Sequence, residues 1–549
     1  MTTKLCKNCR IDFKITQDDL SFYEKIGVPS PTLCPDCRYQ RRLANRNEWN
    51  FYKRNCSLCG KGMVSLYNPE YPGPVYCHMC YWSDNWDALD YGRDLDFNRP
   101  FFEQFKEHRF TVPRITLANE SSVNSEYTNQ ANNNRNCYMI VAANECEFCM
   151  YGNWNQNSKE CVDCWNVKEC ELIYESLDCL KCYHSAWLET CVDSSHCYFG
   201  NDLRGCNDCF GCVGLRQKSY CWFNEQLTKD EYQKRLEAFD WSHEAIGSSR
   251  KKLQELRLKI PVEYYHGSQI LNCTGDYIGF SKNMKNCFNC FKNENLKYSQ
   301  DAWEAKDCMD LTETLDNTMD YEVEGTGWGQ RNVSTSKKWY GSDVYYSELT
   351  FHADNLFGCV SMIKKNYCIF NKQYSPEDWK AVKEKIVEHM KKTGEWGEFF
   401  PATISPFPYN DTVALDYFPM TKDEVLAKGW RWYDKPHKEY TIGGDVFRCT
   451  STTGDEGSGC AGVGAFRLHP MEIEFYKKMS SGGGSASGGK LPTPELCFPC
   501  RLRARLARRN PRKLWSRECM KCSAPIETSY APDRPEIVYC EECYNKEVA

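Results

Sequence analysis

Two stretches of the chain read almost alike: GCVGLRQKSYCWFNEQLTKDEY at residues 211–232 and GCVSMIKKNYCIFNKQYSPEDW at residues 358–379. Their offset is 147 residues, which is seven times 21, and cysteines recur at a spacing of 21, as in Cys149, Cys170 and Cys191. A fixed period of this size is typical of a solenoid, in which each repeat stacks on the previous one. We therefore predict a duplicated, cysteine-rich β-solenoid-like repeat of 21-residue period.

The cross-section of the coil is left open by the sequence. Cysteines often fall three residues apart, as in Cys206, Cys209 and Cys212, which is not the two-residue alternation of a strand. Each copy ends in a helix signal: Thr228 lies three residues before Glu231, and Ser375 is followed by a proline at the first helical position. These helices are expected to cap the ends of the two stacks.

The central cysteines allow three interpretations. A thiol is small and apolar, so stacked inward cysteines can simply fill the coil. Neighbouring coils can also form further metal sites, pairing Cys161 and Cys164 with Cys179 and Cys182, or recruiting His184 or His196. Thiolates are iron–sulfur ligands as well, but no established cluster spacing is present.

The two ends of the chain are copies of one another. The segment PTLCPDCRYQRRLANRN at 31–47 parallels PELCFPCRLRARLARRN at 494–510, and six cysteines of the first module return at an offset of 463. Two C-x2-C pairs can supply four thiolates in the tetrahedral arrangement that Zn(II) prefers. We predict three such sites: Cys6, Cys9, Cys34 and Cys37; Cys56, Cys59, Cys77 and Cys80; and Cys519, Cys522, Cys540 and Cys543.

A fourth site is expected at the start of the C-terminal module, where the knuckle matching Cys6 and Cys9 is replaced. Cys449 and Cys460 stand there with ten residues between them, and they can complete a site with Cys497 and Cys500. About four Zn(II) ions are therefore expected, with further metal in the central region as an open alternative. All four sites would be closed, so their expected role is to hold small domains folded.

The first ribbon, KLCKNCRIDFKITQDDLSFYEKIGVPSPTLCPDCRYQRR, resembles the family of probable zinc-ribbon domains. The resemblance covers some 40 residues and rests on a C-x2-C knuckle, aromatic residues and a C-P-x-C-R ending: Cys6, Cys9, Phe13, Phe22, Tyr23, Cys34, Pro35, Cys37 and Arg38. The whole layout is similar to cysteine-rich multi-ribbon proteins of uncultivated bacteria. The resemblance implies zinc and a ribbon fold, and it implies no activity.

A basic helix is expected directly after the second knuckle of each outer ribbon. Arginines recur there every four residues, so one helical face is a line of guanidinium groups: Arg38, Arg42, Arg46, Arg501, Arg505 and Arg509. Such a stripe favours a phosphate backbone, through bidentate bonds and counterion release. The alternatives are a carboxylate-rich protein partner, or a solvated face that neutralises the nearby thiolate centres.

The region between the ends is acidic, with twelve Asp and Glu against four Lys and Arg over residues 137–212. It is not expected to bind nucleic acid by charge. An acidic rod between basic ends suggests a bridge or spacer, or a rod onto which the chain's own ends fold back.

Composition excludes several classes of protein. The chain has 549 residues and 36 cysteines, no apolar leader after Met1, and no run near the ~18 apolar residues that span a bilayer. We therefore expect a cytoplasmic protein, and in a reducing cytoplasm so many thiols favour metal binding or buried free cysteine over disulfides; a secreted disulfide scaffold is the alternative that counting leaves open. No P-loop, nucleophile elbow, H-E-x-x-H or dinucleotide fingerprint is present. We expect no enzyme activity, no membrane and no small-molecule substrate.

We predict a mainly β protein with short helices and seven regions: 1–90 tandem ribbons, 91–125 connector, 126–224 first solenoid copy, 225–262 capping helices, 263–372 second solenoid copy, 373–445 capping helix with an aromatic, proline-rich connector, and 446–549 tandem ribbons. The leading hypothesis is a non-enzymatic zinc-binding scaffold that docks on nucleic acid or a ribonucleoprotein through its arginine stripes. The alternative is a thiol-rich metal-binding or metal-buffering protein.

Overall fold

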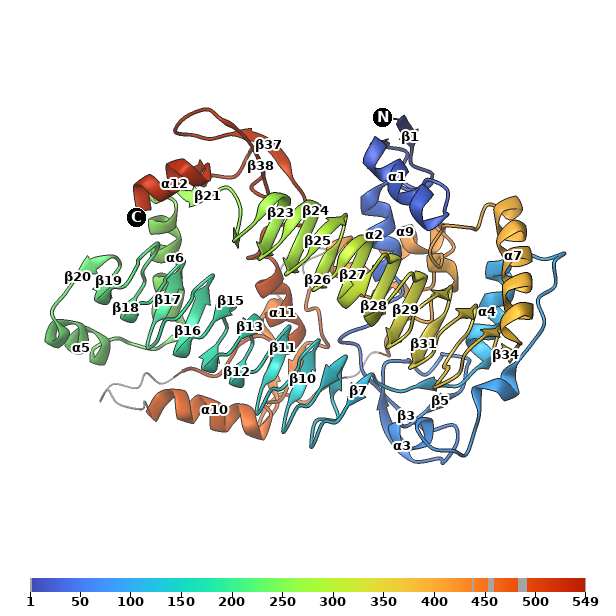
Figure 1. Ribbon diagram of the computed structural model, residues 1–549. Coiled ribbons are helices and arrows are strands. Elements are labelled where there is room, and N and C mark those ends of the chain that lie inside the picture. Colours follow the sequence, from blue (N-terminus) through green and yellow to red (C-terminus); the bar gives the residue numbers. More distant parts are fainter. Residues whose placement is uncertain (1, 437–438, 453–458, 482–490, 549) are drawn as a thin grey trace. The chain divides into compact units, whose positions relative to one another are not determined.

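The computed structural model describes residues 2–436, 439–452, 459–481 and 491–548 (Figure 1). The described chain is mainly β with short helices, as predicted. Its residues form two compact units, each assembled from segments far apart in the sequence. Unit 1 comprises Met1–Leu117, Tyr265–Asp434 and Arg512–Leu514, and unit 2 comprises Ala118–Tyr264, Lys435–Pro511 and Trp515–Ala549.

Each unit contains one β-solenoid, which confirms the predicted duplication. The solenoid of unit 2 has the strands β7 (Asn119–Glu120), β8 (Thr128–Asn129), β9 (Ala131–Asn132), β10 (Tyr138–Val141), β11 (Met150–Asn153), β12 (Lys159–Val162), β13 (Trp165–Lys168), β14 (Glu171–Tyr174), β15 (Leu177–Leu180), β16 (Tyr183–Glu189), β17 (Tyr198–Asn201), β18 (Asn207–Phe210), β19 (Ser219–Trp222) and β20 (Glu225–Gln226).

The solenoid of unit 1 has longer strands near its middle. Its strands are β22 (Gly267–Ser268), β23 (Leu271–Gly279), β24 (Lys282–Phe291), β25 (Glu294–Lys297), β26 (Gln300–Trp303), β27 (Lys306–Thr318), β28 (Tyr321–Gln330), β29 (Val333–Trp339), β30 (Val344–Tyr345), β31 (Glu348–Phe351), β32 (Leu356–Phe357), β33 (Cys368–Ile369) and β34 (Lys372–Gln373).

The period predicted from the cysteines is not the length of one coil, because neighbouring coils pair in parallel at an offset of 12. Tyr138 lies opposite Met150, and Lys159 lies opposite Glu171. The same offset holds in unit 1, where Met309 lies opposite Tyr321. A spacing of 21 is one coil plus three-quarters of the next, so it joins cysteines on different sides of successive coils. Both spacings, the coil length of 12 and the cysteine spacing of 21, are multiples of three residues.

Every third residue of the coils has a left-handed backbone. Positive φ recurs at Asn157, Glu160, Asp163 and Asn166, and this phase runs through most of both solenoids. A left-handed residue turns the chain sharply, so each coil has four corners and four short sides. This three-residue rhythm explains why strand alternation was not seen in the sequence.

The residue that follows each left-handed corner points into the coil. These positions hold small and aliphatic side chains, Leu188 and Leu203 among them. In unit 2 they hold most of the central cysteines, all at most 2% exposed: Cys137, Cys146, Cys149, Cys161, Cys164, Cys170, Cys179, Cys182, Cys191, Cys197, Cys206, Cys209, Cys212 and Cys221. Inward side chains also accept backbone N–H groups of the next coil, as Ser158 Oγ does from Cys170 at 3.2 Å and Cys170 Sγ does from Cys182 at 3.4 Å. Cysteine and serine therefore fill the core and satisfy its polar backbone.

Both capping helices begin where the sequence predicts. Thr228 and Glu231 form a capping box at the start of α5 (Lys229–Glu237), and Ser375 caps α7 (Pro376–Thr393). Each helix follows an antiparallel hairpin, β19 with β20 and β33 with β34, which ends the parallel ladder. In unit 2 the chain continues into α6 (His243–Arg257), and in unit 1 into an irregular connector with α8 (Ala414–Tyr417) and α9 (Lys422–Ala427).

The terminal modules consist of two-stranded sheets and short helices. In unit 1 these are β1 (Thr2–Leu5) with β2 (Asp12–Ile15), β3 (Tyr52–Asn55) with β4 (Gly62–Ser65), β5 (Val75–Tyr76) with β6 (Arg114–Ile115), and α1 (Gln17–Ile26), α2 (Pro35–Leu43), α3 (His78–Tyr81) and α4 (Phe101–Thr111). In unit 2 they are β35 (Phe447–Arg448) with β36 (Ala465–Phe466), β37 (Trp515–Glu518) with β38 (Pro525–Thr528), β21 (Val262–Glu263) with β39 (Val538–Tyr539), and α10 (Pro470–Ser481), α11 (Phe498–Leu506) and α12 (Glu541–Val548). β5 with β6 and β21 with β39 are parallel pairs, and the others are antiparallel.

Candidate metal centres

Four sets of cysteines come together, and they are the four that the sequence predicts. Within each set the sulfur atoms all lie within 4.8 Å of one another, which suits one metal ion: Cys6, Cys9, Cys34 and Cys37; Cys56, Cys59, Cys77 and Cys80; Cys449, Cys460, Cys497 and Cys500; and Cys519, Cys522, Cys540 and Cys543. These are the groups of three or more such ligands that the described residues contain.

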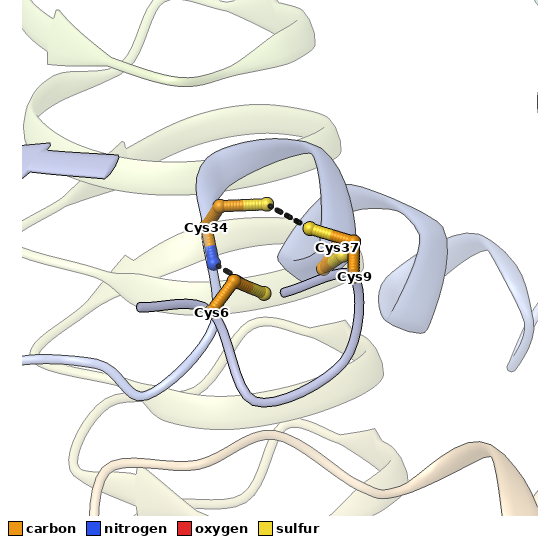
Figure 2. A group of neighbouring side chains, drawn as sticks. All are labelled: Cys6, Cys9, Cys34 and Cys37. Atoms are coloured by element: carbon orange, nitrogen blue, oxygen red, sulfur yellow. Dashed lines mark hydrogen bonds between the residues drawn. The ribbon is translucent and has the colours of Figure 1, made fainter. Parts of the chain in front are cut away.

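The first set joins a tight turn to the start of a helix (Figure 2). Cys6 and Cys9 lie on the turn between β1 and β2, which left-handed Arg10 closes, while Cys34 is the N-cap of α2 and Cys37 lies in its first turn. The sulfurs of Cys9 and Cys34 are 3.7 Å apart. The backbone amide of Cys34 donates to Cys6 Sγ at 3.3 Å, so a hydrogen bond that needs no metal also joins the turn to the helix.

The same amide-to-sulfur bond recurs in all four sets. Cys77 donates to Cys56 Sγ at 3.2 Å, and Cys540 to Cys519 Sγ at 3.3 Å. Burial raises the pKa of Cys6, Cys56 and Cys519, but amide donors outweigh it and lower each pKa to about 6. The amide donors thus favour the thiolate, the form that binds metal, at one cysteine of each of these sets. The pKa of other cysteines in the sets, such as Cys34 and Cys80, is raised, with hydrogen bonds to neighbouring thiols as the main cause.

The fourth set is complete in spite of its altered knuckle. Cys497 donates its amide to Cys449 Sγ at 3.3 Å, and Cys460 Sγ lies 3.4 Å from Cys497 Sγ and 3.6 Å from Cys500 Sγ. A side chain at Gly462 would place its Cβ 3.0 Å from Cys497 Sγ. The absence of a side chain at Gly462 thus lets the backbone after Cys460 pass close to the sulfurs.

The predicted arginine stripe of α2 and the residues after it is buried. Arg38, Arg42 and Arg46 are at most 1% exposed. They pair with carboxylates on the solenoid of unit 1: Arg38 Nε lies 2.9 Å from Asp310, Arg42 Nη1 lies 3.0 Å from Glu322, and Arg46 Nη1 lies 2.7 Å from Glu324. The helix is therefore docked on the solenoid by its guanidinium groups.

The copy in unit 2 is docked in the same way. Arg501 and Arg505 both pair with buried Asp163, and Arg509 Nη2 lies 3.0 Å from Asp178. Arg501 is the copy of Arg38 at offset 463, and Asp163 is the copy of Asp310 at offset 147. The contact between helix and solenoid is thus duplicated together with the elements that make it.

The expectation of an exposed basic face is wrong for these six arginines. Neither a phosphate-binding surface nor a solvated stripe describes side chains that are at least nine-tenths buried in ion pairs. The C-terminal arginines pair with the acidic region 137–212, in line with an end that folds back onto that rod. The N-terminal arginines pair instead with carboxylates of the second solenoid. Nucleic-acid binding itself stays a prediction.

Sequence reasoning missed the carboxylates that receive the arginines. Asp163 and Glu175, like Asp310 and Glu322, are left-handed corner residues one coil apart, and each pair is related to the other by the 147-residue offset. The spacing of 12 between these acidic residues could have predicted that they stack in neighbouring coils. It was overlooked because the cysteines indicated a spacing of 21.

A second buried ion cluster lies in unit 1. Glu348 on β31 receives Arg109 at 2.8 Å and also pairs with Arg114. Burial alone would raise the pKa of Glu348, but the two guanidinium groups lower it to about 2. The cluster joins α4 and β6 to the solenoid.

The central thiols contact backbone oxygens. Cys161 Sγ, for example, lies 3.4 Å from the carbonyl oxygen of Lys159 and 3.6 Å from that of Cys170. Burial is the main cause that raises the pKa of Cys164, Cys179 and Cys290 well above the ordinary value. These surroundings favour the neutral thiol at these three positions, whereas hydrogen bonds to neighbouring thiols lower the pKa of Cys182 to about 4.

Comparison with known proteins adds no family. No protein-family model matches the chain, and no curated protein matches it significantly. Among the described helices, none combines the length and apolar character needed to cross a membrane.

Proposed function

We propose that the chain is a non-enzymatic, zinc-dependent scaffold in which four-cysteine ribbons fasten helices onto a β-solenoid. The supporting observation is that each arginine helix begins at a cysteine of a metal set: Cys34 is the N-cap of α2 and Cys497 is the N-cap of α11. A metal ion at that cysteine would fix the start of the helix. The ion pairs of the arginines that follow set which side of the helix faces the solenoid.

Zinc is the metal that this ligand chemistry favours. Four cysteine sulfurs within 4.8 Å of one another suit tetrahedral Zn(II), with iron as the main competitor for the same ligands. Four sulfur ligands leave no position for water or substrate, so we assign these sets no catalytic role.

A nucleic acid or ribonucleoprotein partner remains part of the proposal, but the arginines would first have to leave their buried ion pairs to contact it. Phosphate would have to displace Asp310, Glu322 or Asp163 from buried pairs. An alternative partner surface on the solenoid would not involve the six arginines. Comparing nucleic-acid affinity with and without metal separates these two cases, because metal removal frees the helices.

The first experiment is metal content per chain by elemental mass spectrometry, with the ratio of absorbance at 260 and 280 nm read on the same sample. The scaffold predicts about four zinc ions per chain, as the four sets indicate. The double variants Cys34→Ser/Cys37→Ser and Cys497→Ser/Cys500→Ser should each lose one ion. The control Cys209→Ser, a solenoid thiol, should lose none.

A second candidate function is soft-metal binding or buffering by the central thiols. It is favoured by the density of cysteine inside the unit 2 solenoid, where 14 cysteines belong to one buried cluster. It predicts more than four metal ions per chain and a loss of metal in Cys209→Ser. A content of about four that is unchanged in that variant would leave only the scaffold.

A further inference from the structure

One corner of the unit 2 solenoid carries three metal-ligating side chains in successive coils. His184, His196 and Asp208 follow one another at the offset of one coil, and all three have the left-handed backbone of a corner, with φ of 42°, 53° and 51°. The residues before them are paired from coil to coil, Tyr183 with Ser195 and Ser195 with Asn207. The three side chains therefore leave the coil from the same edge, one above the other.

The two imidazoles lie against each other without a hydrogen bond to hold them. Their ring centroids are 5.2 Å apart and the rings are nearly perpendicular, at 84°. His184 is only 2% exposed, and among the described residues neither of its nitrogens has a partner at hydrogen-bond distance. Burial and the neighbouring His196 lower the pKa of His184, and the backbone of Met479 opposes this shift only in part. A lowered pKa favours the neutral imidazole, which is the form that binds a metal ion.

Asp208, the carboxylate at this corner, forms no ion pair with a described residue. Asp208 accepts a hydrogen bond from Asn207 Nδ2 at 2.7 Å, and burial raises its pKa. Among the described residues no ion pair within 4.0 Å involves Asp208, although His196 and Lys229 are close enough to act on it.

The equivalent corner of the unit 1 solenoid carries a cation beside its carboxylate. At an offset of 147, the equivalents of His184, His196 and Asp208 are Arg331, Asp343 and Asn355. There a guanidinium group supplies the cation, since Arg331 Nε lies 2.9 Å and Nη2 2.5 Å from the carboxylate of Asp343. Unit 1 satisfies this corner with its own charge, and unit 2 replaces that pair with two nitrogens and a carboxylate.

We propose that His184, His196 and Asp208 form a fifth metal site, for one divalent transition-metal ion such as Zn(II), Ni(II) or Cu(II). Two imidazoles and one carboxylate are a usual donor set for these ions, and water would complete the coordination. The group is less compact than the cysteine sets, so the side chains must rotate towards the ion. An open, partly exposed site exchanges metal more readily than a closed four-thiolate site, so its role would be reversible binding.

The test is a titration of the zinc-loaded full chain with Co(II), followed by visible absorption and by calorimetry. Wild type should bind one further equivalent, and its spectrum should lack the intense thiolate-to-cobalt charge-transfer bands that exchange into a cysteine set would produce. His196→Ala and the isosteric Asp208→Asn should each weaken this binding by about 100-fold or more, beyond what loss of an outer-shell partner costs. His352→Ala, a corner histidine of the other solenoid, is the matched control and should bind like wild type.

Two results would overturn the site: equal Co(II) binding in wild type and His196→Ala, or an extra equivalent that carries thiolate bands. Circular dichroism of each variant shows whether the solenoid is intact. Since zinc stays in the cysteine sets throughout, the outcome does not depend on the scaffold proposal.

Discussion

At the scale of the residue, the left-handed corners set the strongest constraint on the sequence. Asparagine, aspartate, glutamate and aromatic residues fill most of them. Neither valine nor isoleucine occurs among the described non-glycine residues with positive φ, and Thr190 is the β-branched residue found there. A left-handed backbone costs an L-residue roughly 1–2 kcal/mol, and a β-branched side chain tolerates it least.

Asn157, an exposed corner residue with φ of 48°, offers a direct test. We expect Asn157→Val to reduce the free energy of unfolding of unit 2 by about 1–2 kcal/mol, because the side chain clashes with its own backbone. Asn157→Gly should be close to neutral, since relief of strain offsets the greater freedom of the unfolded chain. Urea unfolding measures both, and equal stability of the two variants would contradict the corner geometry.

Glu348 provides a prediction about pH. Its pKa is lowered to about 2 in the folded chain by Arg109 and Arg114, so the stability it contributes is present above its ordinary pKa of 4.5. That stability is lost as the pH falls from about 4.5 towards 2. Glu348→Gln leaves two buried guanidinium groups without a carboxylate and should cost about 3–5 kcal/mol at neutral pH.

The difference between wild type and Glu348→Gln should therefore shrink as the pH is lowered through this window. Chemical unfolding at several pH values measures it. A difference that is constant between pH 7 and pH 3 would show that the pKa of Glu348 is not lowered in the folded chain.

At the scale of the element, the interior of the coil selects side chains by size and by their ability to accept a hydrogen bond. Cys170 stands between Ser158 and Cys182 in one column of inward residues, each one coil from the next. We expect Cys170→Ser to change stability by less than about 1 kcal/mol, because serine fills equivalent positions and keeps an acceptor. Cys170→Leu should cost about 1–3 kcal/mol through overpacking.

Thermal unfolding of both variants checks this, with Cys170→Ala as the control that removes the acceptor without adding volume. If leucine were tolerated as well as serine, the inward orientation of this column would be in doubt.

The docked helix α11 gives a prediction about buried charge. Arg505 pairs with Asp163 as its carboxylate partner, and the side chains of both are at most 1% exposed. Asp163→Asn leaves Arg505 buried and uncompensated, which should cost about 3–5 kcal/mol. The double variant Asp163→Leu/Arg505→Met removes both charges and should recover most of that loss.

Urea unfolding of the single and double variants measures this coupling. Asp310→Asn, the equivalent change in unit 1, should cost less, because Arg42 keeps Glu322 at 3.0 Å. An Asp163→Asn variant as stable as wild type would mean that the helix is not docked in solution.

At the scale of the whole molecule, removal of metal should separate the ribbons from the solenoids without melting the coils. The solenoid cores consist of stacked coils and buried thiols, and their parallel ladders need no metal. A strong chelator should release about four ions and raise hydrogen exchange in α2 and α11, which begin at metal-set cysteines. The strands of both solenoids should stay protected.

Hydrogen-exchange mass spectrometry before and after chelation measures this. Reloading with zinc should restore the protection of both helices, which serves as the control for reversible release. Helices that stay protected in metal-free protein would contradict the proposed coupling.

The repeats and the cysteine sets could be predicted from the sequence. Contacts that depend on which residues stack from one coil to the next could not. The cysteine sets were found because identical spacings occur at both ends, and even Cys449 and Cys460 followed from counting ligands. The coil length was missed because cysteine occupies several inward positions, so its spacing reports only multiples of three. Without the phase of the coil, neither the partners of the arginines nor the alignment of His184 with His196 could be seen.

The pairing of distant segments has a consequence for synthesis on the ribosome. The helix that carries Arg38 emerges first, but its partner Asp310 follows much later in the chain, and Asp163 waits even longer for Arg501. Such contacts close very large loops, so neither unit can be completed locally. Translation therefore leaves the arginine helix unpaired for about half of its duration and the acidic coil unpaired for longer. This nascent interval is when the chain most needs protection from other partners.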